Sequence, residues 1–183
     1  MAILISIQPQ WVEKILNGEK TIEIRKTIPK CKLPCKVYIY CSWGNMRTNY
    51  MLGKRGKVVA EFTLTSVVKF DIESVMFLGK QQELMQKSKI GGMSLRKYLG
   101  NGIGYAWHIG SLKVYDKPKE LSEFKKDLDC DDYPCNKNRD CKYNYYDTSE
   151  GCWACGIDFD GTNCIYKQIK TPPQSWCYVE ELC

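Results

Sequence analysis

The 183-residue chain has no apolar run that approaches the roughly 18 residues a membrane helix needs, so we expect no membrane partner. Its apolar start, Ala2 to Ile7, lacks a basic leader and is too short for a signal peptide. That segment is expected to form a first strand, and the protein is expected to stay in the cytoplasm. No internal repeat or low-complexity tract is visible.

Histidine is almost absent, because His108 is the only one in the chain. A single imidazole excludes two-histidine phosphodiester chemistry, and nothing else in the sequence supports a serine–histidine–carboxylate triad. His108 follows Trp107 in a predicted strand and points to the opposite face. Two readings stay open for it, a structural hydrogen-bonding residue or a residue that lines a ligand site.

Acidic residues are scarce in the first part of the chain. Residues 1–69 hold twelve Lys or Arg against four Asp or Glu, a net charge of +8, whereas residues 127–170 hold five against nine, a net charge of −4. A basic amino-terminal half fits a polyanion such as nucleic acid. Plain solubility explains the same imbalance equally well.

A helix-to-strand switch at residues 9–26 gathers the most informative side chains. Apolar residues recur at helical spacing over 9–17, Gly18 is placed to end that helix, and residues 20–26 then alternate as a strand does. The alternation places Thr21, Glu23 and Arg25 on one strand face. Taken alone, this pattern favours a solvated strand face with a Glu23–Arg25 pair over a ligand site.

The same residues resemble a known motif. Gly18, Lys20, Glu23 and Arg25 match Gly-x-Lys-x-x-Glu-x-Arg, the signature of the ASCH family in the PUA-like superfamily. Segments 3–9, 105–109 and 172–179 also resemble ASCH proteins of phages and Gram-positive prophages. The resemblance covers about residues 1–126 and 171–183, so we expect these to form one domain and 127–170 to be an insertion.

The fold expected from both arguments is α+β and mainly β. Short strands are predicted at 2–7, 20–26, 36–41, 58–64, 105–115 and 175–182, with short helices at 9–17, 72–87 and 94–99. A strand at each end suggests a small barrel closed by its termini. This is the small PUA-like (ASCH) β-barrel with flanking helices, carrying a cysteine-rich insertion.

The resemblance implies a nucleotide or nucleic-acid ligand, RNA first, bound in a cleft near the first helix. The expected ligand-binding residues are Lys20, Thr21, Glu23, Arg25, Trp107 and His108. Lys20 and Arg25 would contact phosphate, and Glu23 would accept a hydrogen bond from a base amino group.

Two other functions are kept as alternatives. ASCH-like amidohydrolases remove the acetyl group of 4-acetylcytidine with a Lys, Thr and Glu set. Lys20 matches their lysine, but Glu23 occupies the position of their threonine. A small hydrolase of modified nucleosides, or a ribonuclease, would use Lys20 and Glu23 as its catalytic acid–base pair. In the third reading, the insertion binds a phage or host protein.

Eleven cysteines are many for a chain without an export signal, and six of them fall within 35 residues of the insertion. These six are Cys130, Cys135, Cys141, Cys152, Cys155 and Cys164. Only Cys152 and Cys155 have the short spacing of zinc knuckles. In a reducing compartment, a zinc site made from four of the six is favoured over disulfides, and an iron–sulfur cluster is a distant third.

We therefore predict about one zinc atom per chain, as in closed four-thiolate sites. Elemental analysis of protein purified without added metal measures this directly. Metal-free protein with all six cysteines paired in disulfides would overturn the assignment.

Overall fold

The computed structural model describes residues 1–44, 50–51, 53–73, 81–100, 102–126, 144–147, 152–155 and 169–182. Six strands form the main sheet: β1 (Ala2–Ile7), β2 (Ile22–Arg25), β3 (Cys35–Cys41), β4 (Lys57–Asp71), β5 (Ile103–Lys119) and β8 (Trp176–Val179). The helical elements in the described part of the chain are α1 (Pro9–Leu16), α3 (Gln81–Ser88), α4 (Gly92–Leu99) and the 3₁₀ turn η1 (Leu121–Glu123). A separate two-stranded sheet contains β6 (Asn144–Asp147) and β7 (Cys152–Cys155).

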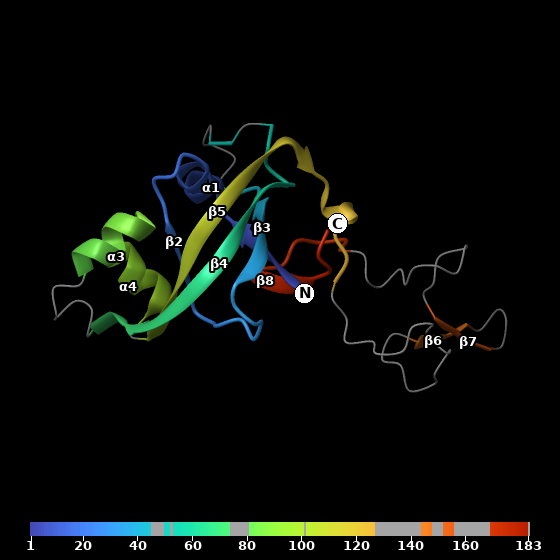
Figure 1. The fold of residues 1–183 in the computed structure, drawn as a ribbon. Helices are drawn as coiled ribbons and strands as arrows, with labels where there is room; N and C mark the ends of the chain where they lie inside the picture. The colour runs from blue at the N-terminus through green and yellow to red at the C-terminus, as the bar shows by residue number, and fades with distance from the viewer. Residues whose placement is uncertain are drawn as a thin grey trace.

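The sheet order is β2-β5-β4-β3-β1-β8 (Figure 1). β1 pairs in parallel with β3 and antiparallel with β8, so the last strand returns beside the first. The α+β class is therefore confirmed, but the expected closure is wrong. Within the described residues no backbone ladder joins β2 to β8. Side chains bridge this gap instead: Arg25 Nη1 donates to Ser175 Oγ at 3.4 Å, and Trp176 Nε1 donates to Thr27 Oγ1 at 3.0 Å.

The core lies on both faces of the sheet, as the alternation in β3 predicts. Val37, Ile39 and Cys41 pack in the core that includes α1, whereas Tyr38 and Tyr40 face a second core with Phe124. Strand periodicity places alternate side chains on opposite faces, so the sequence of β3 alone was sufficient to predict which side chains enter each core.

In the sequence, Val58, Ala60, Phe62 and Leu64 alternate with the residues between them, which predicts one shared face for all four, but Val58 of β4 departs from it. Ile39 pairs with Ala60 while the next residue, Tyr40, pairs with Val58, so Val59 is an extra bulged residue. The bulge sends Val58 into the second core and leaves Val59 beside Ala60 in the first.

Strand β5 runs further than expected. Its register with β4 shifts between Thr63↔Gly110 and Glu61↔Lys113, so the strand is irregular at Gly110. The predicted strand ended at residue 115 and the sequence Asp116-Lys117-Pro118 suggested a turn there, but β5 continues to Lys119. A second register shift in this part of the strand accommodates Pro118, which has no amide hydrogen to donate to the ladder.

Helices α1 and α4 flank β2. Val12 and Ile15 of α1 are buried, and Gly18 ends the helix region with φ of +74°, as expected from its position. Leu95 and Leu99 of α4 cover Ile22 and Ile24 of β2. Helix α4 begins earlier than the predicted start at residue 94, because Gly91 is its N-cap.

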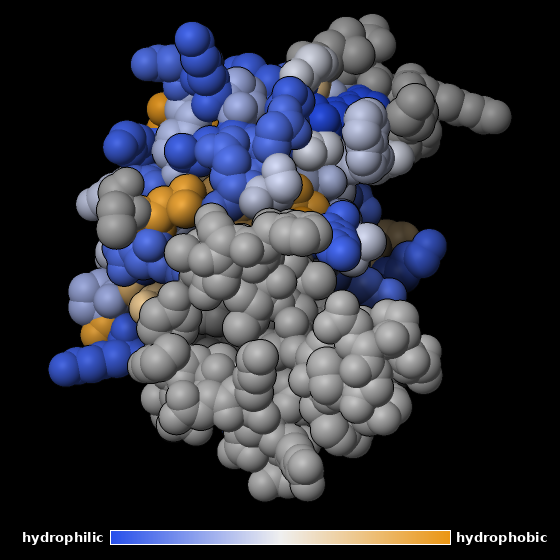
Figure 2. Space-filling view, turned by 90° about the vertical axis from the view of Figure 1, so that its right-hand side faces the viewer, coloured by the Kyte–Doolittle hydropathy of each residue, from blue (hydrophilic) through white to orange (hydrophobic). Residues whose placement is uncertain are grey.

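The exposed surface offers no large apolar face in the view of Figure 2. Over the described residues hydrophilic side chains predominate, and hydrophobic ones show only as small separate spots. None of the described helices is long and apolar enough to cross a membrane.

Phe124 tests the second core. Its side chain is fully buried and meets the Tyr38 ring edge-on, with 5.0 Å between centroids. We expect Phe124→Ala to lower the free energy of unfolding by about 3–5 kcal/mol, because it leaves a cavity. Denaturant titration measures the loss. Met93→Ala is the control, since that side chain is 90% exposed and should shift stability by no more than about 0.5 kcal/mol. Equal effects of the two changes would contradict this packing.

Candidate functional site

A pocket of about 1060 Å³ opens beside β2, on the side of the sheet gap. Its walls come from the end of β1, the start of α1, the last three residues of β2, α4 and residues 172–175 before β8. The lining residues are Ser6, Ile7, Gln8, Gln10, Trp11, Glu23, Ile24, Arg25, Ser42, Ile90, Ser94, Lys97, Tyr98, Pro172, Pro173, Gln174 and Ser175.

Three charged side chains of the motif form one buried array at this pocket. Glu23 Oε1 lies 3.2 Å from Arg25 Nη2, and Glu23 Oε2 lies 3.2 Å from Lys20 Nζ. Lys20 is only 1% exposed, and Glu23 and Arg25 are each 7% exposed. The solvated strand face that composition favoured is therefore not what the chain forms.

Lys20 lies beneath the pocket rather than in its lining. The turn after α1 places it there, with its amide donating to the Lys14 carbonyl at 3.0 Å. Its ammonium donates to the Ser88 carbonyl at 2.7 Å. Burial lowers the pKa of Lys20 below its ordinary value, and the attraction of Glu23 opposes this effect only in part. As placed, Lys20 holds Glu23 in position.

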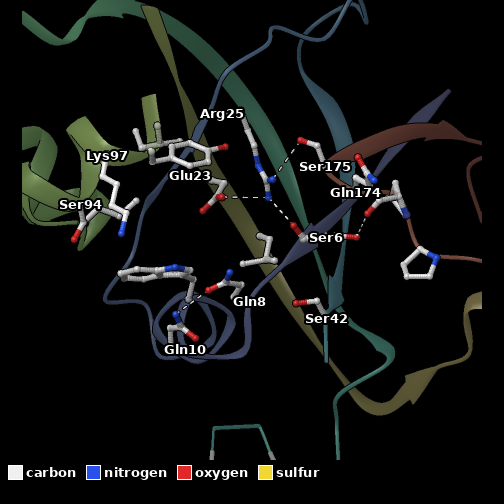
Figure 3. Close-up of a pocket in the computed structure, with 17 residues that line it drawn as sticks. Ser6, Gln8, Gln10, Glu23, Arg25, Ser42, Ser94, Lys97, Gln174 and Ser175 are labelled. Atoms are coloured by element: carbon white, nitrogen blue, oxygen red, sulfur yellow. Dashed lines mark hydrogen bonds and ion pairs between the residues drawn. The ribbon is translucent and has the colours of Figure 1, made fainter. Parts of the chain in front are cut away.

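Arg25 reaches across the gap in the sheet, as the dashed lines in Figure 3 show. Its Nη2 donates to the Ser6 carbonyl at 2.8 Å and its Nη1 to Ser175 Oγ at 3.4 Å. Its Nε is buried and has no hydrogen-bond partner among the described residues. Glu23 Oε2 likewise makes an ion pair with Lys20 but no hydrogen bond. Buried polar groups are normally paired, so Arg25 Nε is a donor left over for a ligand or water, whereas Glu23 Oε2 already has Lys20 as its ionic partner.

Two aromatic side chains from opposite helices also line the pocket, Trp11 of α1 and Tyr98 of α4. Lys26 Nζ lies 5.2 Å from the centroid of the Tyr98 ring, and Lys20 Nζ lies 5.5 Å from that of Trp11. Burial raises the pKa of the Tyr98 phenol, while the nearby Arg25 guanidinium opposes the shift. Tyr98 therefore stays a neutral ring with a hydroxyl donor at neutral pH.

The other predicted site residues lie outside this lining. Thr21 is exposed just before β2, and its amide donates to the Lys87 carbonyl. Trp107 is fully buried opposite Glu23 in the β2–β5 ladder, and its indole Nε1 has no hydrogen-bond partner among the described residues. His108 is partly exposed opposite Ile22, so it lies on the other face of the sheet.

Sequence reasoning missed much of the pocket wall. Ser6 and Gln8 lie in a segment that carried the resemblance, but nothing in it marked them as site residues. Lys97 and Tyr98 belong to a short helix with no motif, and only their packing against β2 brings them to the pocket. Ser175 comes to Arg25 from 150 residues away.

The six cysteines of the predicted zinc site lie outside the residues whose side chains the structure describes. Elsewhere, Cys31 and Cys35 place their Sγ atoms 2.8 Å apart. Burial raises the pKa of Cys35 to about 12, with further contributions from Cys31. This disfavours the thiolate form that a metal requires.

The sequence matches no family model and no curated protein. Among solved structures, the ASCH protein of Zymomonas mobilis is 21% identical and superposes with a TM-score of 0.50, covering 66% of this chain and 73% of that one. A serine-to-alanine variant of the same protein gives 20% identity and a TM-score of 0.52, covering 66% and 74%. This chain has the ASCH-domain fold. The resemblance drawn from the motif is thus confirmed at the level of fold, and the pocket lies on an ASCH scaffold.

The buried ammonium of Lys20 makes a prediction about pH. The pKa of Lys20 is lower in the folded than in the unfolded chain, so the folded chain releases this proton at a lower pH. Between that pH and 10.5 the unfolded state therefore holds more protons than the folded state. Stability contributed at this site therefore increases with pH. We expect the stability difference between the wild type and Lys20→Met to grow in favour of the wild type between neutral and alkaline pH. Urea titrations of both proteins across this range measure it, and curves that stay parallel would contradict the assignment.

Proposed function

We propose that the pocket binds one nucleotide of a single-stranded nucleic acid, with RNA as the preferred polymer. The observation that carries the proposal is a buried Arg25 Nε without a hydrogen-bond partner among the described residues, in a pocket that Glu23 and two aromatic side chains also line. Single-stranded nucleic acids are bound by stacking bases on aromatic rings while cations contact the phosphates.

The size and polarity of the pocket suit this ligand. A volume of about 1060 Å³ is at the upper end of small-molecule sites, so it accommodates a nucleotide with its neighbouring phosphate. Trp11 and Tyr98 supply ring faces, and Glu23 supplies an acceptor for a base amino group. Ser6, Ser94 and Ser175 line the same space, and hydroxyls of this kind can pair with the 2′-hydroxyl that distinguishes RNA from DNA.

Positive charge at the rim supports phosphate binding. Lys97 lines the pocket, and Lys26 lies on the Tyr98 ring beside it. Both belong to a chain of net charge +6 whose first 69 residues carry +8. Such a field favours binding that depends on salt, because each neutralised phosphate releases counterions.

The hydrolase reading has less support from the geometry. A general base must reach the proton that it removes. Lys20 is buried outside the pocket lining, and both Ser88 and Glu23 already engage its ammonium. We therefore favour a binding module, and the lowered pKa of Lys20 reflects its burial rather than catalysis.

Arg25 and Lys97 test the proposal by removing cations from the pocket. We expect Arg25→Ala and Lys97→Ala to weaken binding of a short single-stranded RNA about 10-fold or more, because charge-assisted hydrogen bonds contribute about 1.5–3 kcal/mol. Fluorescence anisotropy at several salt concentrations measures the affinity and its salt slope. A DNA strand of the same sequence should bind less tightly.

The matched control is Arg96→Ala. Arg96 is on the same helix as Lys97, pairs with Glu73, and is absent from the pocket lining. The Arg96→Ala change removes the same charge as the other two changes. Equal weakening of RNA binding by all three would therefore indicate non-specific attraction to the protein's positive charge rather than binding in the pocket. Thermal melts exclude misfolding of Arg25→Ala. Absence of RNA binding at low salt would overturn the proposal.

A further inference from the structure

Trp43 is a large apolar side chain that the core does not use. It is 59% exposed and lies two residues after the end of β3, directly after Ser42. Part of its indole lies against the backbone of Gly56, where a Cβ would come within 2.7 Å of the ring. Gly56 also has φ of +77°, so glycine at this position allows both the turn and the close approach of the ring.

The backbone around Trp43 is held by several hydrogen bonds. Arg55 is only 9% exposed, and its guanidinium donates to the carbonyls of Tyr50 at 2.9 Å and of Trp43 at 3.4 Å. The Gly56 amide donates to the Cys41 carbonyl at 2.8 Å. The chain therefore holds an exposed indole in a fixed place. A rigid aromatic face binds a ligand at a lower conformational entropy cost than a mobile one.

Trp43 directly follows a residue of the pocket wall. Ser42 lines the pocket, and its amide donates to the Ile7 carbonyl at 2.9 Å, at the end of the neighbouring strand β1. Gly44 packs on Pro9 at the start of α1, where a Cβ would meet the proline ring at 2.6 Å. Figure 3 shows Ser42 and Gln8 on the same side of the pocket. Trp43 is thus the next residue along the chain from this wall, although it is not part of the lining itself.

We propose that Trp43 is a stacking platform for the base that neighbours the nucleotide in the pocket. The inference rests on the proposed function and extends it, because it makes the ligand an oligonucleotide rather than a free nucleotide. The ring face is sequence-tolerant, since every base presents a π surface. Tyr50, which is 42% exposed, and Lys54 lie in the same loop, so it offers the mixture of aromatic and basic groups that such strands prefer.

The test compares two ligands on the wild type and on two variants of Trp43. Affinities of a ribonucleoside monophosphate and of a six-nucleotide single-stranded RNA are measured by calorimetry for the wild type, Trp43→Ala and Trp43→Phe. We expect the wild type to bind the oligonucleotide more tightly than the monophosphate. Trp43→Ala should lose roughly 5- to 150-fold in oligonucleotide affinity, the range for one base–aromatic stack, and leave monophosphate affinity unchanged. Trp43→Phe should retain most of the affinity.

Val114→Ala is the control for loss of an exposed apolar side chain, because Val114 is 42% exposed on β5 and outside the pocket lining. It should change neither affinity. If the monophosphate binds but the oligonucleotide gains nothing, or if Trp43→Ala keeps the gain, the platform is wrong while the pocket assignment stands. If neither ligand binds the wild type, the proposed function fails and the platform fails with it.

Discussion

A single buried carboxylate between two cations sets the constraint on which the rest of this structure depends. Glu23 pairs with both Lys20 and Arg25, and all three are more than nine-tenths buried. Burying charge is costly unless every charged group finds partners. Here the partners come from the Ser88 carbonyl at the end of α3, the Ser6 carbonyl in β1 and the Ser175 hydroxyl before β8. The array therefore ties three distant segments to β2.

This arrangement also explains why the pocket lies where the sheet is open. Closing β2 onto β8 would bring a backbone ladder into the space that Arg25 spans. The gap instead leaves room for the pocket that Glu23 and Arg25 line, and Arg25 Nε has no hydrogen-bond partner among the described residues. With Lys20 protonated, the array carries one excess positive charge, which an anionic ligand of the kind proposed above would compensate. Specific hydrogen-bonding groups and a favourable field are thus consequences of the same three residues.

Much of the framework was predictable from the sequence. The alternation of β3, the helical spacing of α1 and the terminal strands β1 and β8 are local patterns, and these elements formed as expected. The motif placed Glu23 and Arg25 together. The register shift at Val59 was not predictable, because a bulge depends on the pairing of two strands. Trp11 and Tyr98 meet at the pocket only through the packing of α1 and α4 around β2, and no spacing in the chain encodes that.

The two ends of the segment that the sequence predicts to be an insertion lie side by side in the described part of the chain. The Ile169 amide donates to the Phe124 carbonyl at 3.2 Å, and both side chains are buried in the second core. Lys126 forms a bridge with Val179 of β8. Residues 124–126 and residue 169, at the two ends of this segment, are thus neighbours in the described structure. Shortly after residue 169, residues 172–175 form a pocket wall held by Ser6 and Arg25. The same hydrogen bonds therefore complete the pocket wall and hold residues 172–175 against β1 and β2.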